Sequence, residues 1–240
     1  MNLKSYFAIP FAKISTKKVY KWANDPVKTQ DKVFKNLIKI GKKTAFGKDH
    51  DFKNVATYDD FKSRVKVQEY EGLRSYVDRI IAGESDVLWK GKPIYFAKTS
   101  GTTSGAKYIP ITKESMPTHI KSARNALLFY INEKNDASFV DGKMMFLQGS
   151  PILEDKNGIK LGRLSGIVAH YVLKNRLPSW KTNCIEDWDK KVDAVINETE
   201  NEDMRLIGGI PSWVQMYFEK LIDKTGKTIS EIFPQLNLFV

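Results

Sequence analysis

The sequence predicts an α/β protein in which a helical front end is followed by a mixed sheet with flanking helices. Residues 1–90 carry apolar side chains three and four positions apart, which is the spacing of amphipathic helices. From residue 91 to 240, short strand-like apolar runs alternate with helical patterns, as in an α/β sheet. The 240 residues, of which 42% are hydrophobic, suit one large domain or two small ones.

The helical part contains recognisable start and stop signals. Residues 25–43 form an amphipathic pattern with Gly41 near its end, where glycine commonly caps a helix. Thr57 and Asp60 have the spacing of a capping box that opens a short helix. Another helix is expected over residues 70–82. These segments make residues 1–90 mainly helical.

The second part, residues 91–240, is predicted from shorter signals. Pro110 places the strand predicted at 108–112 at a sheet edge or a bulge, because proline has no N–H to donate to a neighbouring strand. Pro117 must lie in the first turn of its helix or mark the true start. The expected strands are 94–97, 108–112, 144–147, 204–207 and 236–240. Helices are expected at about 113–132, at 186–199 and from Pro211 onward, with a turn at 155–158.

The net charge of +11 is concentrated in the first 68 residues, which hold 16 Lys and Arg against 6 Asp and Glu, a balance of +10. Such a segment can bind nucleic acid or an anionic membrane. Its lysines are interleaved with apolar residues at helical spacing, which favours a solvated helical surface instead. We therefore expect no nucleic-acid partner, and keep an anionic partner as the alternative.

Three further features concern the compartment. No stretch approaches the roughly 20 apolar residues that a membrane helix needs, so no membrane span is expected. The apolar run near the N-terminus is broken by Pro10 and is followed by lysines rather than by a small-residue cleavage site, which argues against a signal peptide. Cys184 is the single cysteine, so an internal disulfide is excluded. These features favour the reducing cytoplasm.

A loop rich in serine, threonine and glycine lies between the first two predicted strands. Glycine allows positive φ and a close approach of the backbone to a ligand. Successive N–H groups can then form an anion nest, to which hydroxyls add donors and a lysine adds charge. This composition predicts a phosphate-binding loop, although a polar hairpin loop without a ligand stays open. The residues concerned are Thr99, Ser100, Gly101, Thr102, Thr103, Ser104, Gly105 and Lys107.

The loop does not fit the P-loop pattern. Counting from Gly101, Ala106 stands where the second glycine is required, and Tyr108 stands where a hydroxyl must reach Mg²⁺. A P-loop also leads into a helix, whereas this loop leads into the strand predicted at 108–112. A strand–loop–strand arrangement with a trailing lysine is typical of adenylate-forming enzymes.

At these residues the chain resembles a known family. Thr99-Ser-Gly-Thr-Thr-Ser-Gly105 with Lys107-Tyr-Ile-Pro-Ile-Thr112 is similar to the first motif of the auxin-responsive acyl-acid amido synthetases, the Gretchen Hagen family of the adenylate-forming superfamily. The resemblance covers about residues 35–240. Its flanking stretches are Thr44-Ala-Phe-Gly-Lys-Asp-His-Asp-Phe52, Thr57-Tyr-Asp-Asp-Phe61, Trp89-Lys-Gly-Lys-Pro-Ile-Tyr-Phe-Ala-Lys98 and Gly208-Gly-Ile-Pro-Ser-Trp213.

The resemblance implies an ATP-dependent ligase that acts in two steps with Mg²⁺. A small carboxylic acid would be activated as acyl-AMP, and an amine, usually an amino acid, would then displace AMP. Such chemistry needs positioning and charge neutralisation rather than a Ser/His/Asp set. By this resemblance, phosphate contacts would come from Ser100, Thr102, Thr103 and Ser104. Lys107 would contact the leaving pyrophosphate. The helix carrying His119 and Ser122 could line the nucleotide or acyl pocket.

The chain departs from the family pattern in one respect. The family's second and third motifs, which bind adenine and ribose, are absent and would lie beyond Val240. We therefore expect residues 1–240 to be an incomplete N-terminal large domain of an adenylate-forming enzyme, weakly active or inactive alone. Two alternatives stay open: a non-catalytic nucleotide-binding remnant or interaction module with a basic N-terminal surface, and nucleic-acid binding through residues 1–68.

Other candidate residues carry weaker signals. The histidines His50, His119 and His170 lack a second ligand at metal spacing, so no metal site is expected. Cys184 has no neighbouring base in sequence and is interpreted as inert. The acids at 186, 187 and 189 are interpreted as the start of a helix, where negative charge suits the dipole.

Overall fold

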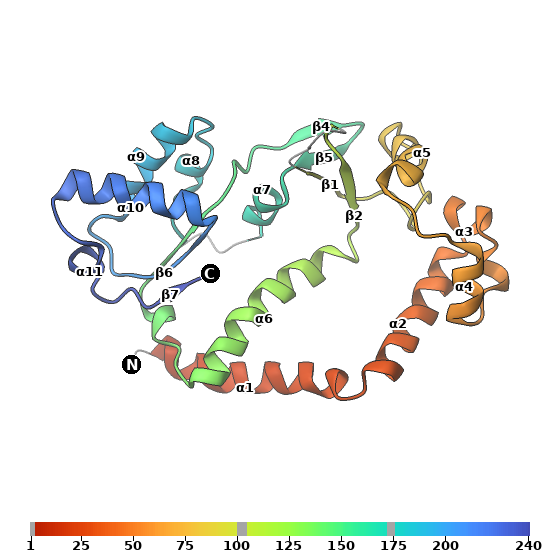
Figure 1. The fold of residues 1–240 in the computed structure, drawn as a ribbon, viewed down its shortest axis with the longest axis horizontal. Coiled ribbons are helices and arrows are strands. Elements are labelled where there is room, and N and C mark those ends of the chain that lie inside the picture. Colours follow the sequence, from red (N-terminus) through yellow and green to blue (C-terminus); the bar gives the residue numbers. More distant parts are fainter. Residues whose placement is uncertain (1–2, 100–104, 172–175) are drawn as a thin grey trace. The chain divides into compact units, whose positions relative to one another are not determined.

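The structure is a computed structural model that describes residues 3–99, 105–171 and 176–240. Its contacts divide the chain into two compact units (Figure 1). Unit 1 contains Met1–Lys17, Ile120–Ile152 and Arg163–Val240, and unit 2 contains Lys18–His119 and Leu153–Gly162. Two long helices, α1 (Leu3–Ala23) and α6 (Met116–Lys134), have residues in both units. Each unit is described by itself.

Unit 2 begins with the predicted helices. Thr57 caps α4 as expected: its Oγ1 accepts from the Asp60 N–H at 3.2 Å, and the Asp60 carboxylate accepts from the Thr57 N–H at 2.8 Å. The core between these helices is aromatic and aliphatic, built on Ile38, Phe52 and Val55. The elements are α2 (Pro26–Gly41), α3 (Ala45–Asp49), η1 (Phe52–Asn54), α4 (Tyr58–Arg64) and α5 (Tyr70–Ile81).

Unit 2 also holds a mixed sheet of order β2-β1-β5-β4, in which β1 pairs antiparallel with β2 and parallel with β5. One face packs on α5, because Val77 and Ile80 of that helix form a core cluster with Phe96 of β1. A two-residue turn at Asn157 and Gly158, both with positive φ, joins β4 to β5. The strands are β1 (Tyr95–Lys98), β2 (Tyr108–Ile111), β4 (Glu154–Lys156) and β5 (Ile159–Gly162).

The helix predicted from residue 113 begins at Met116 instead. Thr112 and Ser115 hold each other in a turn: the Ser115 Oγ accepts from the Thr112 N–H at 3.0 Å, and the Thr112 Oγ1 accepts from the Ser115 N–H at 3.1 Å. These side chains satisfy backbone donors that would otherwise be unpaired before the helix. Pro117 then lies in the first turn of α6, as the sequence indicates.

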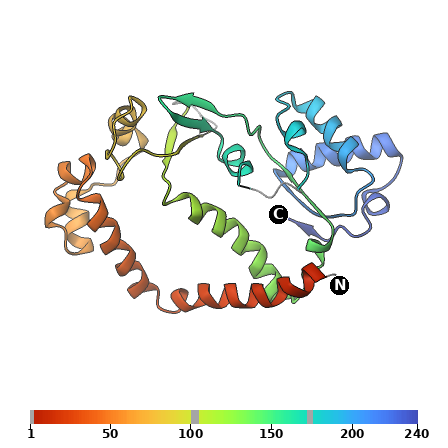
Figure 2. The same cartoon turned by 180° about the vertical axis from the view of Figure 1, so that it is seen from behind.

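Unit 1 is built on a parallel sheet of order β3-β6-β7. The central strand β6 supplies Met204, Leu206 and Ile207, which are fully buried. α9 and α10 lie next to each other in this unit (Figure 2), joined by a 2.7 Å hydrogen bond between the hydroxyls of Thr199 and Tyr217. The elements are η2 (Ser138–Asp141), β3 (Lys143–Leu147), α7 (Leu164–Ala169), α8 (Trp180–Asn183), α9 (Trp188–Thr199), β6 (Met204–Gly209), α10 (Pro211–Thr225), α11 (Ile229–Ile232) and β7 (Leu238–Phe239).

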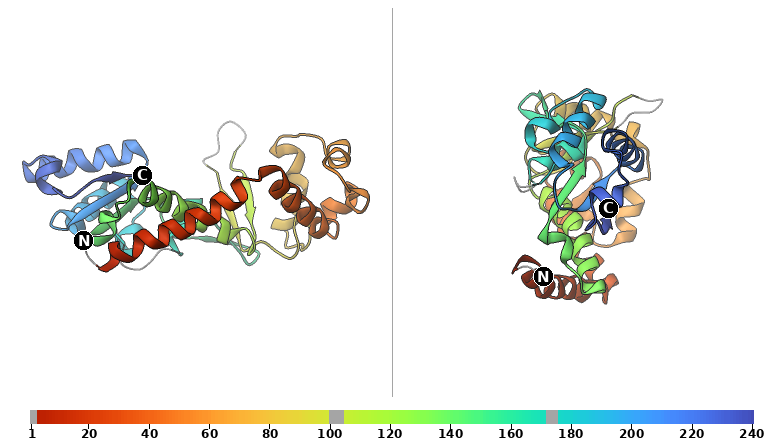
Figure 3. Two further views of the ribbon diagram at one scale, coloured as in Figure 1. Left: turned by 90° about the horizontal axis from the view of Figure 1, so that it is seen from below. Right: turned by 90° about the vertical axis from the view of Figure 1, so that its left-hand side faces the viewer.

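The ends of α9 and α10 follow the sequence signals. Asp187 caps α9, accepting from the Lys190 N–H at 2.9 Å, which confirms the acidic helix start. Pro211 opens α10, and Gly226 closes it with a φ of 67°. The ring of Phe218 packs edge-on against Phe239 at 6.0 Å, so α10 lies beside β7 (Figure 3). Among the described residues, no helix is both long and apolar enough to cross a bilayer.

Glu198 of α9 links three donors on the segment that leads into α8. Its carboxylate accepts from the Ser179 N–H at 2.7 Å, and from the Ser179 and Thr182 hydroxyls at 2.6 Å each. Burial alone raises the pKa of Glu198, but these hydrogen bonds outweigh it and hold the pKa below the ordinary 4.5. Since the folded pKa is lowered, this stabilisation is present above pH 4.5 and is lost as the pH falls through the folded pKa.

Glu198→Gln is therefore expected to lower the free energy of unfolding by about 1–3 kcal/mol at neutral pH. The loss should shrink as the pH falls through the folded pKa of Glu198, which lies below 4.5, because the wild-type carboxylate then becomes protonated itself. Urea unfolding followed by circular dichroism at several pH values measures this. The matched control is Glu186→Gln, at an exposed position next to the same helix. A loss that does not change with pH would contradict the assignment.

Candidate functional site

The Ser/Thr/Gly loop connects β1 to β2, as the sequence predicts, and its two ends are held together. The Thr99 N–H donates to the Lys107 carbonyl at 3.0 Å, and the Lys107 N–H donates to the Thr99 Oγ1 at 3.3 Å. The predicted contacts Ser100, Gly101, Thr102, Thr103 and Ser104 lie outside the described residues and stay predictions. The described part of the loop is thus a closed hairpin base at Thr99 and Gly105–Lys107.

Gly105 has a left-handed backbone conformation, which a phosphate loop and a plain hairpin loop can both contain. Its φ is +79°, in the left-handed region that favours glycine. A Cβ built at this position would meet nothing within 4 Å. The glycine is therefore explained by its backbone conformation and not by crowding. A positive φ next to residues of ordinary φ is the geometry in which neighbouring N–H groups converge on an anion.

Lys107 places a cation at the base of the loop. Its Nζ lies 5.7 Å from the centre of the Tyr70 ring. Within the described ranges, no carboxylate lies close enough to Lys107 to form a salt bridge. The neighbouring Glu71 is held by Arg74, with 2.7 Å between the Arg74 Nη2 and a carboxylate oxygen. The hydrogen bond from Arg74 lowers the pKa of Glu71, with a smaller contribution from the charge of Lys107. The carboxylate of Glu71 is thus paired with Arg74 rather than with Lys107.

Tyr70 fixes the strand that follows the loop. Its hydroxyl accepts from the Tyr108 N–H at 3.0 Å and lies 3.4 Å from the Tyr108 carbonyl oxygen, to which it donates. The first residue of α5 thereby holds the first residue of β2, directly after Lys107. No local pattern could have indicated this contact, because the two tyrosines are 38 residues apart.

Tyr70→Phe is expected to cost about 1–2 kcal/mol of stability, because it leaves the Tyr108 N–H without this partner while keeping the ring. The ring near Lys107 is retained, so any effect on ligand binding should be within a few-fold. Thermal unfolding and equilibrium binding of pyrophosphate measure the two effects. Tyr58→Phe, at a position of unit 2 where the side chain is 61% exposed, is the comparison. Full stability in Tyr70→Phe would contradict an anchoring role.

Two further lysines lie on the same sheet. The Nζ of Lys156 donates to the Tyr108 hydroxyl at 3.4 Å and lies 4.5 Å from the centre of its ring. The Nζ of Lys98 lies 4.0 Å from a carboxylate oxygen of Glu154. Strands β1 and β4 therefore each add a lysine close to the hairpin. This charge suits a polyanionic ligand.

His119 and Ser122, the other predicted pocket residues, lie on α6 and are both exposed. Their assignment to a pocket stays a prediction. His50 packs locally: its ring stacks on Phe46 at 4.0 Å, and its Nδ1 lies 2.9 Å from the Phe46 carbonyl oxygen. Cys184 is a free thiol. In the described part of the chain, no group of three or more His, Cys, Asp or Glu residues could hold a metal ion.

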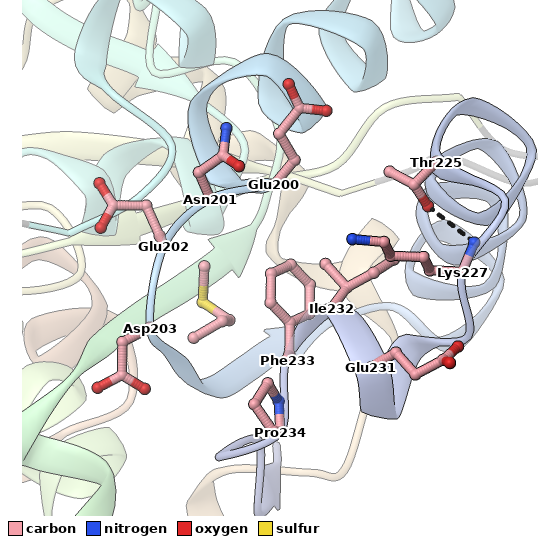
Figure 4. A pocket seen from close by; sticks show the side chains of 11 residues that line it. Glu200, Asn201, Glu202, Asp203, Thr225, Lys227, Glu231, Ile232, Phe233 and Pro234 are labelled. Atoms are coloured by element: carbon pink, nitrogen blue, oxygen red, sulfur yellow. Dashed lines mark hydrogen bonds between the residues drawn. The ribbon is translucent and has the colours of Figure 1, made fainter.

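A cavity of about 600 Å³ in unit 1 is lined by acids but does not have the features of a catalytic centre (Figure 4). Its carboxylates are already paired: Glu200 with Lys224 at 2.8 Å, Glu202 with Lys143 at 3.5 Å, and Asp203 with Arg205 at 2.8 Å. Glu231 accepts from the backbone N–H of Thr228 as part of a capping box. These groups stabilise helix ends and loops.

The sequence comparisons identify the family. A model described as the GH3 family N-terminal domain matches residues 15–204. The chain belongs to the GH3 family. Among curated relatives, an indole-3-acetic acid-amido synthetase of Arabidopsis thaliana is 43% identical over 74 residues, covering 30% of this chain and 12% of the relative. A jasmonoyl–L-amino acid synthetase of Nicotiana attenuata is 26% identical over 128 residues, covering 52% of this chain and 22% of the relative.

Solved structures agree on the fold. The AtGH3.15 acyl acid amido synthetase in complex with 2,4-DB matches with a TM-score of 0.72 at 18% identity, covering 92% of this chain and 42% of that one. Another structure described as the GH3.15 acyl acid amido synthetase matches with a TM-score of 0.67 at 20% identity, covering 85% and 39%. The fold is thus that of the N-terminal part of these GH3 synthetases, and the chain spans less than half of their length.

Proposed function

We propose that this GH3 chain provides the phosphate-binding part of an ATP-dependent acyl-adenylating ligase of the amido synthetase type. The observation that carries the proposal is the β1–β2 hairpin, where the left-handed Gly105 and the Lys107 ammonium meet at the base of the Ser/Thr/Gly loop. The relatives of this chain are amido synthetases by name. The proposal extends that chemistry to a protein containing residues 1–240.

The proposed reaction has two balanced steps. A carboxylate oxygen attacks the α-phosphorus of ATP, the bond from that phosphorus to the β-phosphate oxygen breaks, and pyrophosphate leaves with the electron pair. An amine nitrogen then attacks the acyl carbon, the bond to AMP breaks, and the amide forms with loss of a proton. Lys107 and the loop amides would stabilise the negative charge that grows on the leaving pyrophosphate.

Mg²⁺ would neutralise phosphate charge during the first step. Nucleotide-bound Mg²⁺ takes most of its ligands from phosphate oxygens and water, so this use does not require a cluster of acids in the protein. In this proposal the protein's own contribution is positioning: the hairpin holds the β- and γ-phosphates, and Tyr70 keeps the strand after Lys107 in place.

The test is ATP–pyrophosphate exchange measured with a panel of carboxylic acids. We expect exchange that depends on one class of acid when residues 1–240 are joined to the remaining part of a GH3 synthetase. Residues 1–240 alone are expected to give little or no exchange, because they span only 42% of the solved relative. Absence of exchange with every acid in the joined protein would overturn the proposal and favour a non-catalytic nucleotide-binding module.

The proposed substrates are therefore a small carboxylic acid and an amine such as an amino acid. A direct assay for the second step follows amide formation by mass spectrometry after the acyl-AMP has formed. Exchange without any amide product across the common amino acids would keep adenylation and remove amide formation from the proposal.

We propose the cytoplasm as the compartment, since a free thiol suits reducing conditions.

A further inference from the structure

Helix α1 is oriented in an unusual way within unit 1. The fully buried residues on its inner face are the small or polar Ser5, Ala12 and Thr16; Ala12 packs in a core cluster with residues of α6 and η2, and the partly buried Ile9 packs against the same cluster. Its large apolar residues face outward: Leu3 is 72% exposed, Phe7 60%, Ile14 56% and Phe11 48%. Amphipathic helices of globular proteins normally have the reverse arrangement.

Specific contacts fix this orientation. The Ser5 N–H, in the first turn of α1, donates to the Asp141 carboxylate at 3.2 Å, a favourable place for negative charge near a helix N-terminus. The Thr16 hydroxyl donates to the Ala12 carbonyl at 3.0 Å, which satisfies it inside the buried face. The Thr16 bond lies within α1, so the contact to Asp141 and the packing of Ala12 set the orientation; rotating α1 to bury its aromatic residues would break the first and expose Ala12.

The outward residues form one stripe. Leu3, Phe7, Phe11 and Ile14 are four, four and three positions apart, so they lie along one side of α1. We call these four side chains the α1 stripe. All of them precede residue 15, where the match to the GH3 N-terminal domain begins. The stripe therefore belongs to a part of the chain that the family match does not account for.

The charged side chains that α1 itself carries all have one sign. The 21 residues of α1 contain lysines at 4, 13, 17, 18 and 21 and no Asp or Glu. The Arg124 guanidinium adds a cation 5.8 Å from the centre of the Phe11 ring. The surface thus combines exposed aromatic and aliphatic side chains with lysines whose flexible stems can carry the charge away from an apolar layer.

We propose that the α1 stripe and its lysines dock this protein on an anionic lipid bilayer, with the stripe inserted at the headgroup–acyl boundary. A helix with lysines beside exposed Phe and Leu is the composition of interfacial membrane helices. Nucleic acid is a poorer fit, because Leu3 and Ile14 gain nothing from a phosphate backbone. A second copy is also a poorer fit, because two such faces would bring like charges together. This docking does not depend on the proposed ligase activity.

The experiment is flotation of the full chain with lipid vesicles of phosphatidylcholine alone, and of phosphatidylcholine and phosphatidylserine in a three-to-one ratio. Binding is expected only to the second kind, and it should weaken as salt is raised. Replacing Phe7 and Phe11 with glutamine together should lower partitioning about tenfold, through lost apolar burial. The triple change Lys4→Gln, Lys13→Gln and Lys17→Gln should lower it about 100-fold, since each lysine contributes about fivefold.

The control is Ile152→Gln, which removes another exposed aliphatic side chain of unit 1 outside α1 and should leave binding unchanged. Circular dichroism checks that every variant keeps its helix content. Equal binding by all variants, or no binding to phosphatidylserine vesicles, would overturn the proposal. If the wild-type chain self-associates but binds no vesicles, and the double phenylalanine variant does not self-associate, the α1 stripe binds a second copy instead. Binding to duplex DNA that ignores the phenylalanine changes, again without vesicle binding, would assign the lysines to nucleic acid.

Discussion

Replacing Lys107 with alanine is expected to lower the rate of ATP–pyrophosphate exchange about 100-fold in a protein that joins this chain to the rest of a GH3 synthetase. The reason is electrostatic. The Lys107 ammonium has no carboxylate partner in a salt bridge among the described residues, and it lies at the base of the loop that carries the phosphate-binding prediction. Charge that develops on a leaving pyrophosphate would lose its nearest fixed cation.

The matched control is Lys160→Ala. Lys160 lies on β5 of the same sheet, where its Nζ is 3.1 Å from the Asp155 carboxylate. Because an exposed ion pair of this kind contributes little, exchange should stay within about twofold of the wild-type rate. The assay measures incorporation of labelled pyrophosphate into ATP at saturating acid. Equal rates for Lys107→Ala and Lys160→Ala would remove Lys107 from the reaction.

Gly47→Ala is expected to cause the largest loss of stability among single methyl additions in the helical part. A Cβ at Gly47 would lie 2.1 Å from the backbone oxygen of Gly41 and 2.7 Å from its carbonyl carbon. Backbone at the end of α2 cannot move aside as a flexible side chain can, so α3 and α2 would have to separate. We expect a loss of about 3 kcal/mol or more in the free energy of unfolding.

This loss corresponds to a decrease of about 6–12 °C in Tm for a chain of this size. Thermal unfolding followed by circular dichroism measures it. Ser75→Ala, which adds no atoms at an exposed position in α5, is the control and should change Tm by only about 1–2 °C. If Gly47→Ala changes Tm by no more than the control does, α2 and α3 are not packed as described.

Sequence periodicity predicted the local elements well. Helices α2, α4, α5, α9 and α10 and the strands on both sides of the Ser/Thr/Gly loop lie within a few residues of their predicted ranges. Such elements carry their own signals, such as the Thr57 capping box and the proline at the start of α10. The family resemblance was also confirmed by the match to the GH3 N-terminal domain.

Contacts between distant residues could not be predicted in the same way. The hydroxyl of Tyr70 meets the backbone of Tyr108 across 38 residues, and no periodicity relates the two. Helix α1 was missed as a continuous helix because Pro10 lies inside it. Its orientation was equally hidden, since an apolar stripe normally predicts the buried face, and here the buried face carries Ser5, Ala12 and Thr16.

In the candidate site too, local residue types could be read from the sequence, whereas contacts between distant residues could not. Residue types alone indicated the phosphate loop, because glycines, hydroxyls and a lysine have a direct chemical meaning at a phosphate. What sequence could not supply is the support around the loop: the hairpin closure at Thr99 and Lys107, and the cations that other strands bring to it, such as Lys156. These depend on the pairing of β1 with β2 and β5.

The central claim, that the β1–β2 loop binds the phosphates of ATP, is tested most directly by hydrogen–deuterium exchange of the chain with and without Mg²⁺-ATP. Backbone amides that bind phosphate should exchange more slowly. We expect protection in peptides covering residues 97–108, and loss of that protection in Lys107→Ala. Unchanged exchange at 97–108 with ATP at saturation, or protection confined to other segments, would contradict it.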